Sequence, residues 1–250
     1  MATTAVDLAL ALDPVQLAIR AGVVPDPWQA GLLRSQERQL LMLCARQSGK
    51  SMVAALLAVH TALYLAPALV LLLAPSLRQA AELFRCARGL YRALGETVSA
   101  VEEESALRLE LSNGSRVVSL PGSESTVRTY SKVSLLVLDE CARCPDDLYA
   151  AVRPMLAVSG GRLVLLSTPF GKRGFFHREW SEGGEAWARV KVTAEECPRI
   201  TRQFLEQERA SIGDWWFKQE YLCEFVDPLD SAFRAEDVRA ALDTSITPLF

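Results

Sequence analysis

Residues 44–51 read Cys-Ala-Arg-Gln-Ser-Gly-Lys-Ser, a stretch that lies between an apolar run and a helix-forming run. The apolar run Leu40–Leu43 before it predicts a short buried strand. The segment Met52–Leu65 after it is rich in Ala, Leu and Met without Gly or Pro, which predicts a helix. At a strand-to-helix turn, main-chain N–H groups and the helix dipole face an anion. The stretch therefore predicts a phosphate-binding loop.

The loop carries the polar side chains that a nucleoside triphosphate needs. Lys50 would reach the β- and γ-phosphates, and the Ser51 hydroxyl would bind Mg²⁺. Cys44 stands where the usual motif has its first glycine, so the loop must turn without that glycine. The alternative is an ordinary helix N-cap at Ser48 or Ser51.

A second motif lies far downstream, where the apolar run Val133–Leu138 predicts a fully buried parallel strand. The run ends in Asp139 and Glu140. Because ligands of open α/β sheets bind at the carboxyl ends of strands, these acids would lie beside the phosphates. Asp139 would support the Mg²⁺ ion, and Glu140 would orient and polarise the attacking water. The alternative is a solvated acidic turn after a strand.

The rest of the chain alternates between strand and helix patterns, which predicts an α/β fold with a mostly parallel sheet flanked by helices. Asn113-Gly114 predicts a hairpin. Residues 5–35 look helical in pieces, interrupted at Asp13-Pro14 and at 25–27. Further strands are predicted at 68–74, 107–111, 116–120, 163–167 and 190–192, and further helices at 77–93, 145–156, 201–210 and 214–224.

Composition narrows the class of protein. The 250 residues are half hydrophobic and carry a net charge of −3, which suits one α/β domain or one domain with a small appendage. Six cysteines without a paired framework favour an intracellular, reduced protein, and the lone pair Cys141 and Cys144 gives little support for zinc. The N-terminus lacks a signal-peptide pattern. Met52–Ala74 is long and apolar enough for a membrane span, but Pro67 interrupts it.

Together these motifs resemble the large subunit of phage terminases, the ATP-driven DNA-packaging motor of tailed bacteriophages. The resemblance covers nearly the whole chain. It rests on Pro27-Trp28-Gln29, on Ala45–Ser51, on Leu136–Glu140, on Ser167–Gly174 and on Gln219–Phe225.

The resemblance implies a P-loop NTPase of the RecA-like (ASCE) type that uses ATP and Mg²⁺. It implies an ATPase core with an N-terminal helical segment over 1–197 and a helical lid over 198–250. The C-terminal nuclease domain of such subunits is expected to be absent from these 250 residues, so we expect an isolated motor domain that does not cut DNA.

The resemblance also assigns roles to particular residues. Gln29 would hydrogen-bond the adenine base, although a core role for its neighbour Trp28 is the alternative. Arg46, Gln47, Ser48 and Gly49 would bind nucleotide together with Lys50 and Ser51.

Ser167, Thr168 and Pro169 would couple hydrolysis to motion. Their alternative is a Thr-Pro turn that closes a strand.

Arg128, just before the acidic strand, lies where related terminases have an arginine finger that enters the neighbouring subunit's ATP site. A planar cation there stabilises charge on the transferred phosphoryl group. Family members usually follow this arginine with Gly, whereas Thr129 follows here. A surface arginine is the plain alternative, and Arg46 is the competing catalytic arginine.

A stripe of arginines on the predicted helix 77–93 is the candidate DNA contact. These residues share one helix face, and phosphate contacts by such a stripe depend on salt. An ordinary solvated helix face is the alternative. The stripe consists of Arg78, Arg85, Arg88 and Arg92.

Partners also follow from the resemblance: double-stranded DNA, the portal protein of the procapsid, the small terminase subunit and other copies of this chain. The expected assembly is a ring, most simply a pentamer, while the isolated domain is expected to be a monomer. It would work in the host cell cytoplasm, docked on the procapsid, neither secreted nor in a membrane. The rival functions are a helicase-like DNA-dependent ATPase and an ATP-gated assembly module.

Overall fold

In the part of the chain that the structure describes, the fold is built on one sheet of eight strands. The computed structural model describes residues 2–95, 98–122, 127, 129–227 and 241. Within them the strand order is β3-β4-β5-β2-β6-β7-β1-β8. The strands from β5 to β8 in this order are parallel, while β3 and β4 are antiparallel additions at one edge. The predicted α/β fold with a mostly parallel sheet is confirmed.

The strands are short, as their apolar runs predicted. Their bounds are β1 Gln39–Cys44, β2 Leu69–Ala74, β3 Val101–Glu104, β4 Arg108–Leu111, β5 Arg116–Pro121, β6 Leu135–Asp139, β7 Arg162–Ser167 and β8 Ala188–Val192.

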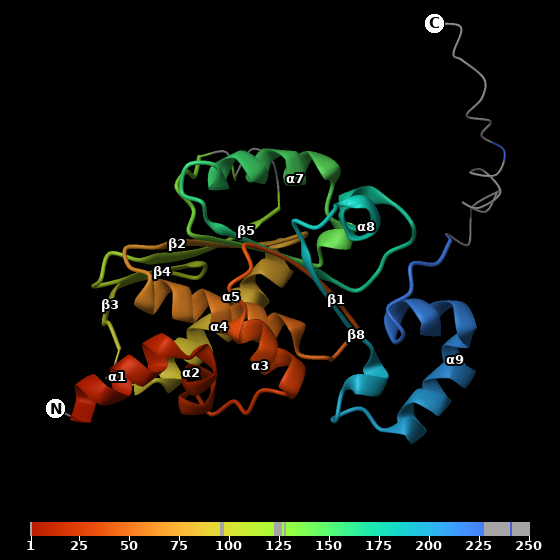
Figure 1. Ribbon diagram of the computed structural model, residues 1–250, viewed down its shortest axis with the longest axis horizontal. Coiled ribbons are helices and arrows are strands. Elements are labelled where there is room, and N and C mark those ends of the chain that lie inside the picture. The colour runs from red at the N-terminus through yellow and green to blue at the C-terminus, as the bar shows by residue number, and fades with distance from the viewer. Residues whose placement is uncertain (1, 96–97, 123–126, 128, 228–240, 242–250) are drawn as a thin grey trace, which may run out of the picture.

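The helices are α1 Ala2–Leu12, α2 Pro14–Arg20, α3 Pro27–Arg34, α4 Lys50–Tyr64, α5 Leu77–Ala93, α7 Asp146–Val152, α8 Gly174–Glu182 and α9 Arg202–Glu220. In Figure 1, α1 to α5 cover one face of the sheet, and α7 and α8 cover the other.

Both faces of the sheet are buried, which explains the continuous apolar runs of its strands. Side chains alternate between the faces of a strand. Leu40 and Met42 of β1 therefore join the core beneath α2 to α5. Leu41 and Leu43 of the same strand join the core beneath α7 and α8. All four are at most 1% exposed.

Several predicted boundaries shift for local reasons. The hairpin at Asn113-Gly114 is confirmed, with Gly114 at φ 81° between the antiparallel β4 and β5. The predicted helix 145–156 is wrong in its second half, because α7 ends at Val152 and a 3₁₀ turn with Pro154 follows. The predicted helices 201–210 and 214–224 form one element that is kinked at Gly213 and ends at Glu220.

One strand and one α-helix of the described residues were not predicted. β3 is Val-Glu-Glu-Glu with every residue exposed, so it has no apolar alternation to reveal it. α8 follows the glycine-containing loop after β7, and its two buried phenylalanines are adjacent rather than spaced at a helical period.

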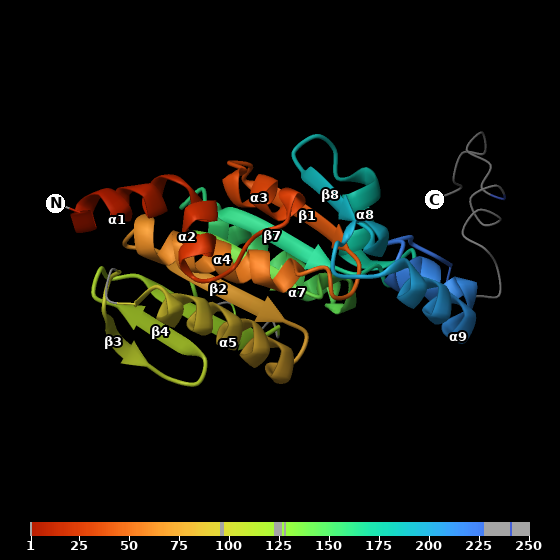
Figure 2. The same cartoon turned by 90° about the horizontal axis from the view of Figure 1, so that it is seen from below.

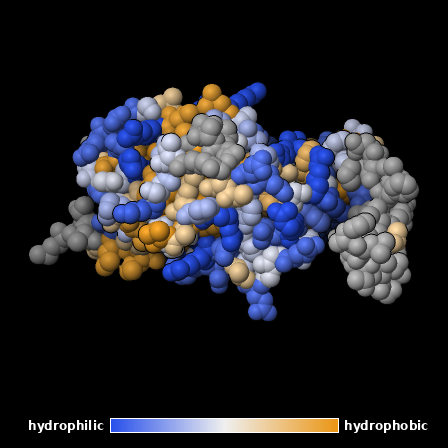
Figure 3. All heavy atoms as spheres, turned by 90° about the horizontal axis from the view of Figure 1, so that it is seen from above, coloured by the Kyte–Doolittle hydropathy of each residue, from blue (hydrophilic) through white to orange (hydrophobic). Residues whose placement is uncertain are grey.

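The predicted phosphate- and metal-binding residues lie at the carboxyl ends of the parallel strands, at one end of the sheet. In Figures 1 and 2, α9 lies beyond the carboxyl ends of β1 and β7. Seen from the side of α7 and α8, hydrophilic side chains cover much of the surface, and hydrophobic atoms form separate groups, one at the end that carries α1 and one at the upper edge of the view (Figure 3). Among the described residues, no helix has both the length and the apolar character that a membrane crossing requires.

Candidate functional site

The loop between β1 and α4 turns sharply without a glycine at its first position. Cys44 is the last residue of β1 and is fully buried. The left-handed backbone conformations fall instead on Gln47, at φ 60°, and on Gly49, at φ 92°. Gly49 is the N-cap of α4, so the alternative of Ser48 or Ser51 as an ordinary helix cap is wrong. The 15-residue helix α4 begins directly after this loop, so the unpaired N–H groups of its first turn lie at the loop.

Two contacts join the loop to the acidic turn after β6. Lys50 Nζ lies 3.0 Å from Glu140 Oε1. Ser51 Oγ donates a 2.9 Å hydrogen bond to Asp139 Oδ2, across 88 residues of sequence. The alternative of a solvated acidic turn is wrong for Asp139, which is only 8% exposed. The sheet order explains why the loop after β1 lies close to the acidic turn after β6, because β7 alone separates these two strands and all three run parallel.

Burial and neighbouring charges shift the pKa values of Asp139 and Lys50. Desolvation raises the pKa of Asp139, although Lys50 and the Ser51 hydrogen bond oppose that rise. Desolvation also acts to lower the pKa of Lys50, but the negative charges of Glu140 and Asp139 outweigh it and raise that pKa. Lys50 therefore stays charged in the site. Glu140 is held at φ 49°, and strained backbone of this kind concentrates at functional positions.

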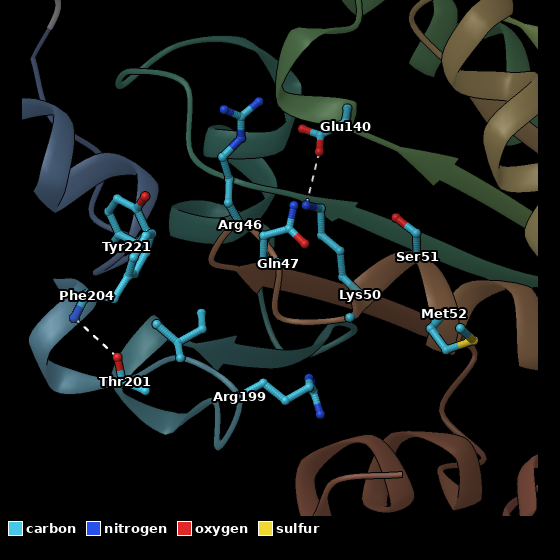
Figure 4. Close-up of a pocket in the computed structure, with 12 residues that line it drawn as sticks. Arg46, Gln47, Lys50, Ser51, Met52, Glu140, Arg199, Thr201, Phe204 and Tyr221 are labelled. Atoms are coloured by element: carbon cyan, nitrogen blue, oxygen red, sulfur yellow. Dashed lines mark hydrogen bonds and ion pairs between the residues drawn. The ribbon is translucent and has the colours of Figure 1, made fainter. Parts of the chain in front are cut away.

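A cavity of about 990 Å³ opens between the loop and α9. Lys50, Ser51 and Glu140 lie on one side of it and Thr201, Phe204 and Tyr221 on the other, while Arg199 lies below the loop with its guanidinium toward the Lys50 side (Figure 4). Ile200 also lines the cavity. Arg46, Gln47, Gly49 and Met52 complete the lining. Its size is within the range of small-molecule sites, and it combines cations with apolar and aromatic groups.

The segment after β7 meets the acidic turn from the other side. Ser167 Oγ accepts a 3.2 Å hydrogen bond from the Ala142 N–H, and Ser167 and Thr168 are at most 2% exposed. Pro169 follows Thr168, and two residues further the Gly171 N–H donates to Gln219 Oε1 at 3.2 Å. The predicted coupling residues thus lie between the acidic turn and the end of α9.

Glu220 is a residue of the site whose contacts sequence reasoning missed. Its main-chain oxygen accepts from the Arg46 N–H at 3.2 Å. Its carboxylate lies 3.4 Å from Arg46 Nε and 3.6 Å from Arg143 Nη2. Arg143 also packs over the ring of Phe170, with 4.2 Å to the centroid. The only available signal was the segment 219–225, which the family resemblance included without giving Glu220 a role.

Gln29 and Arg199 converge on the back of the loop between β1 and α4. Gln29 is 5% exposed, and its Oε1 accepts from the Asp26 N–H at 2.8 Å. Its Nε2 donates to the Ser48 main-chain oxygen at 3.4 Å. Arg199 Nη2 donates to the same oxygen at 3.0 Å. Arg199 also pairs with Asp26 at 2.8 Å.

The remaining predicted residues lie away from the cavity. On α5, Arg85 pairs with Glu82 at 2.6 Å, so this part of the stripe is balanced by a neighbouring carboxylate. Arg88 and Arg92 both pair with Glu104 of β3, at 3.1 and 2.7 Å. Arg78 is exposed near the start of the helix. Arg128 lies outside the described residues.

Comparisons with known proteins agree with this geometry. A family model described as the terminase large subunit, T4likevirus-type, N-terminal, matches residues 41–240. The large terminase subunit of Thermus virus P23-45 is 26% identical over 251 aligned residues, which cover 87% of this chain and 52% of that protein. The chain spans about half the length of the curated relatives that it matches.

Solved structures share the fold. The large terminase ATPase domain of Thermus phage P74-26 superposes with a TM-score of 0.73 at 23% identity, covering 84% of this chain and 97% of that one. The large terminase of a thermophilic bacteriophage, solved in complex with ADP, gives a TM-score of 0.59 at 13% identity, covering 76% and 49%. Because the family model matches most of the chain, this protein belongs to the terminase large subunit family and has the RecA-like (ASCE) fold of its ATPase domain.

Proposed function

We propose that this site binds ATP with Mg²⁺ and hydrolyses it, and that hydrolysis drives double-stranded DNA into a procapsid. The observation that carries the proposal is the pair of contacts Lys50–Glu140 and Ser51–Asp139 at one end of a nucleotide-sized cavity. A cation, a hydroxyl and two carboxylates are the groups that phosphoryl transfer from a nucleotide requires. They are held here by a loop and a strand end that the fold fixes.

The donor set fits Mg²⁺. This ion takes oxygen ligands and is usually held by one or two carboxylates, substrate phosphates and water. Ser51 Oγ and Asp139 Oδ2 already lie 2.9 Å apart, so both could face one ion. When bound, Mg²⁺ would neutralise charge on the phosphate oxygens.

The ion pair of Lys50 and Glu140 is the resting form of the site in this proposal. A triphosphate offers Lys50 a competing anion, which would release the Glu140 carboxylate. Glu140, 22% exposed at the cavity, is then free to accept a hydrogen bond from the attacking water and to orient it. Gln47 and Gly49 line the cavity beside Lys50, and Ser48 lies behind them in the same loop. These residues would surround the phosphates.

Arginines complete the proposed chemistry. Arg128 would act as an arginine finger in a neighbouring subunit's site, and Arg46 is the candidate within its own site. Arg46 lines the cavity with 67% of its side chain exposed, so it can move toward a phosphate. Ser167, Thr168 and Pro169 would pass the change to α9, since the neighbouring Gly171 contacts Gln219.

The wider function is also a proposal. The chain would form a homo-oligomeric ring, most simply a pentamer, that works with the portal protein and the small terminase subunit on the procapsid in the host cytoplasm. Family membership supports this setting, and the thermophilic phage terminase solved with ADP supports nucleotide binding by this fold. The arginines of α5 are the proposed DNA contact, although three of the four are paired with carboxylates.

The rival functions differ in what they require. A helicase-like ATPase would unwind a forked duplex, whereas a packaging motor need not. An assembly module would close an interface on ATP without turnover.

The test is ATP turnover per chain at increasing protein concentration, with and without duplex DNA, for the parent protein and Arg128→Ala. We expect turnover that rises with concentration and collapses in the variant. Flat turnover that is indifferent to Arg128 would refute the shared site and would make Arg46 the catalytic arginine. ATP binding without any turnover would favour the assembly module.

A further inference from the structure

We propose that a second cavity, at the end of the sheet opposite the Lys50 cavity, binds a phosphate group. This cavity has a volume of about 360 Å³ and lies at the amino ends of β1 and β7, whereas α9 lies beyond their carboxyl ends (Figures 1 and 2). Arg38 and Arg153 line it and would donate hydrogen bonds to the phosphate oxygens. The phosphate would belong to a free phosphate compound or to a nucleic acid backbone, two sources that offer the same chemistry. The site is separate from the proposed ATP chemistry and does not depend on it.

Arg153 is held in place by neutral groups. Its Nη1 donates to Gln39 Oε1 and to the Tyr149 hydroxyl, both at 3.0 Å. Its guanidinium also lies over the Tyr149 ring, 5.6 Å from the centroid. These partners orient the cation without offsetting its charge. Within the described part of the chain, both hydrogen bonds come from Nη1, so the N–H groups of Nε and Nη2 remain for a ligand.

Arg38 lies over the glycine loop that precedes β7. A methyl group built on Gly160 would lie 3.4 Å from Arg38 Nη1 and 3.7 Å from its Cζ, so the guanidinium packs closely on this glycine. At Gly161 a methyl group would lie 2.0 Å from the Val133 main-chain oxygen, so no side chain fits there. Both glycines line the cavity. The loop therefore places no side chain between Arg38 and the cavity.

A third arginine adds positive charge beside the cavity. Arg162 Nε donates to the Glu37 main-chain oxygen at 2.9 Å, which places its guanidinium beside the backbone that leads into β1. Its Nη2 is buried and has no hydrogen-bond partner among the described residues. Burial lowers the pKa of Arg162, and the negative charge of Glu37 opposes this, so the arginine stays charged at neutral pH.

The charge of this cluster is not balanced by ion pairs. Among the residues that the structure describes, Arg38, Arg153 and Arg162 form no ion pair with a carboxylate, whereas three of the four arginines of the α5 stripe do. Glu37, the acid whose charge acts on Arg162, is exposed. An anion that enters the cavity would therefore meet cations that no carboxylate already neutralises, which strengthens its binding.

A phosphate fits this arrangement better than a carboxylate does. Guanidinium groups bind phosphate oxygens through two parallel N–H bonds. A phosphate offers three acceptor oxygens, so two arginines from different elements can share it, whereas a carboxylate has two oxygens and fills one arginine fork. The Gly160 N–H already donates to the Leu156 oxygen at 2.9 Å, and the Gly161 N–H donates to Ser159 Oγ at 3.3 Å. The arginines, and not the loop, therefore supply the donors.

The experiment measures two ligands on the full chain without Mg²⁺: pyrophosphate by calorimetry and a short fluorescent DNA duplex by anisotropy. Arg38→Ala should weaken the ligand of this site by about tenfold. Arg153→Lys, which keeps the charge but loses the planar fork, should weaken it as well. The control Arg20→Ala removes the same charge from an exposed position at the end of α2 and should change neither ligand. Pyrophosphate that binds beside Lys50 contributes equally to every variant, so differences between the variants report the second cavity alone.

The two ligands separate the two sources of phosphate. If the ligand is a free phosphate compound, the variants lose affinity for pyrophosphate and keep their affinity for the duplex. If it is a nucleic acid backbone, they lose affinity for the duplex, and Arg38→Ala lowers the salt slope of its binding by about one. Affinities for both ligands that Arg38→Ala and Arg153→Lys change no more than Arg20→Ala does would overturn the proposal. ATP turnover enters none of these measurements, so a failure of the proposed hydrolysis would leave this test unaffected.

Discussion

Replacing Lys50 with Met should destabilise the nucleotide-free protein strongly. Lys50 Nζ is 3.0 Å from Glu140 Oε1, and the lysine side chain is 9% exposed. At an effective dielectric constant of about 20, this attraction amounts to about 5 kcal/mol. The desolvation cost of the lysine disappears with it, so we expect a net loss of about 3 kcal/mol in the free energy of unfolding. For a chain of this size, that lowers Tm by roughly 9 °C.

The loss should depend on pH in a defined direction. Burial raises the pKa of Asp139 in the folded protein, and Lys50 opposes the rise. An acid whose folded pKa is raised binds its proton more tightly when folded, so its contribution falls as pH rises from the unfolded pKa through the folded one. Without Lys50 the pKa of Asp139 rises further. The deficit of the variant should therefore grow as the pH rises above the ordinary pKa of an aspartate.

The assay is urea unfolding followed by circular dichroism across that pH range, without nucleotide. Lys172→Met is the matched control, because Lys172 pairs with Asp227 at 3.1 Å at a more exposed position. It should cost less than about 1 kcal/mol. Equal losses for the two variants, or a Lys50→Met deficit that does not change with pH, would show that Lys50 does not stabilise the fold through Glu140 and Asp139.

Three further outcomes follow from the same geometry. Gly49→Ala should lower the free energy of unfolding by about 1–2 kcal/mol in a thermal melt, because Gly49 has φ 92° and its new methyl would meet Gln29. The control Gly31→Ala lies inside α3, where the methyl meets nothing, and it should stabilise by about 0.5–1 kcal/mol. Equal effects of the two variants would contradict backbone strain at Gly49. Glu220→Gln should lower the free energy of unfolding, measured in urea, by about 1–2 kcal/mol, because it weakens the contacts to Arg46 and Arg143. The control Glu206→Gln, at an exposed position, should change it little. An unchanged stability of Glu220→Gln would mean that those contacts contribute nothing. Cys86 should be the first thiol that iodoacetamide modifies, as mass spectrometry of the native protein can report, because the other five cysteines are buried; earlier modification of Cys44 would contradict its burial.

The strand, loop and helix around residues 44–51 and the strand before Asp139 could be predicted because each is a local pattern. An apolar run, a loop and a helix-forming run leave few choices at Leu40–Leu65, and the apolar run before Asp139 fixes the second strand. Ligands bind at the carboxyl ends of parallel strands, and both motifs follow such ends. This rule alone predicts that Lys50, Ser51 and Asp139 lie close together. The contacts in the structure agree with that inference.

Long-range partners could not be predicted. Arg199 meets Asp26 across 173 residues and the Ser48 oxygen across 151, and no spacing rule connects such positions. Glu220 is one of many acids in the sequence, and only the packing of α9 against the loop reveals that two arginines share it. β3 was missed because an exposed edge strand of three glutamates owes its conformation to its neighbour β4.

In the proposed function, Glu140 activates water for ATP hydrolysis in a site that Lys50 and Ser51 hold together. The most direct measurement is phosphate release by the parent protein and Glu140→Gln under saturating ATP and Mg²⁺, with ATP affinity measured for both. We predict that the variant binds ATP with similar affinity while its turnover falls by about 10²–10⁴-fold. Turnover by Glu140→Gln equal to that of the parent protein would show that Glu140 does not activate the water.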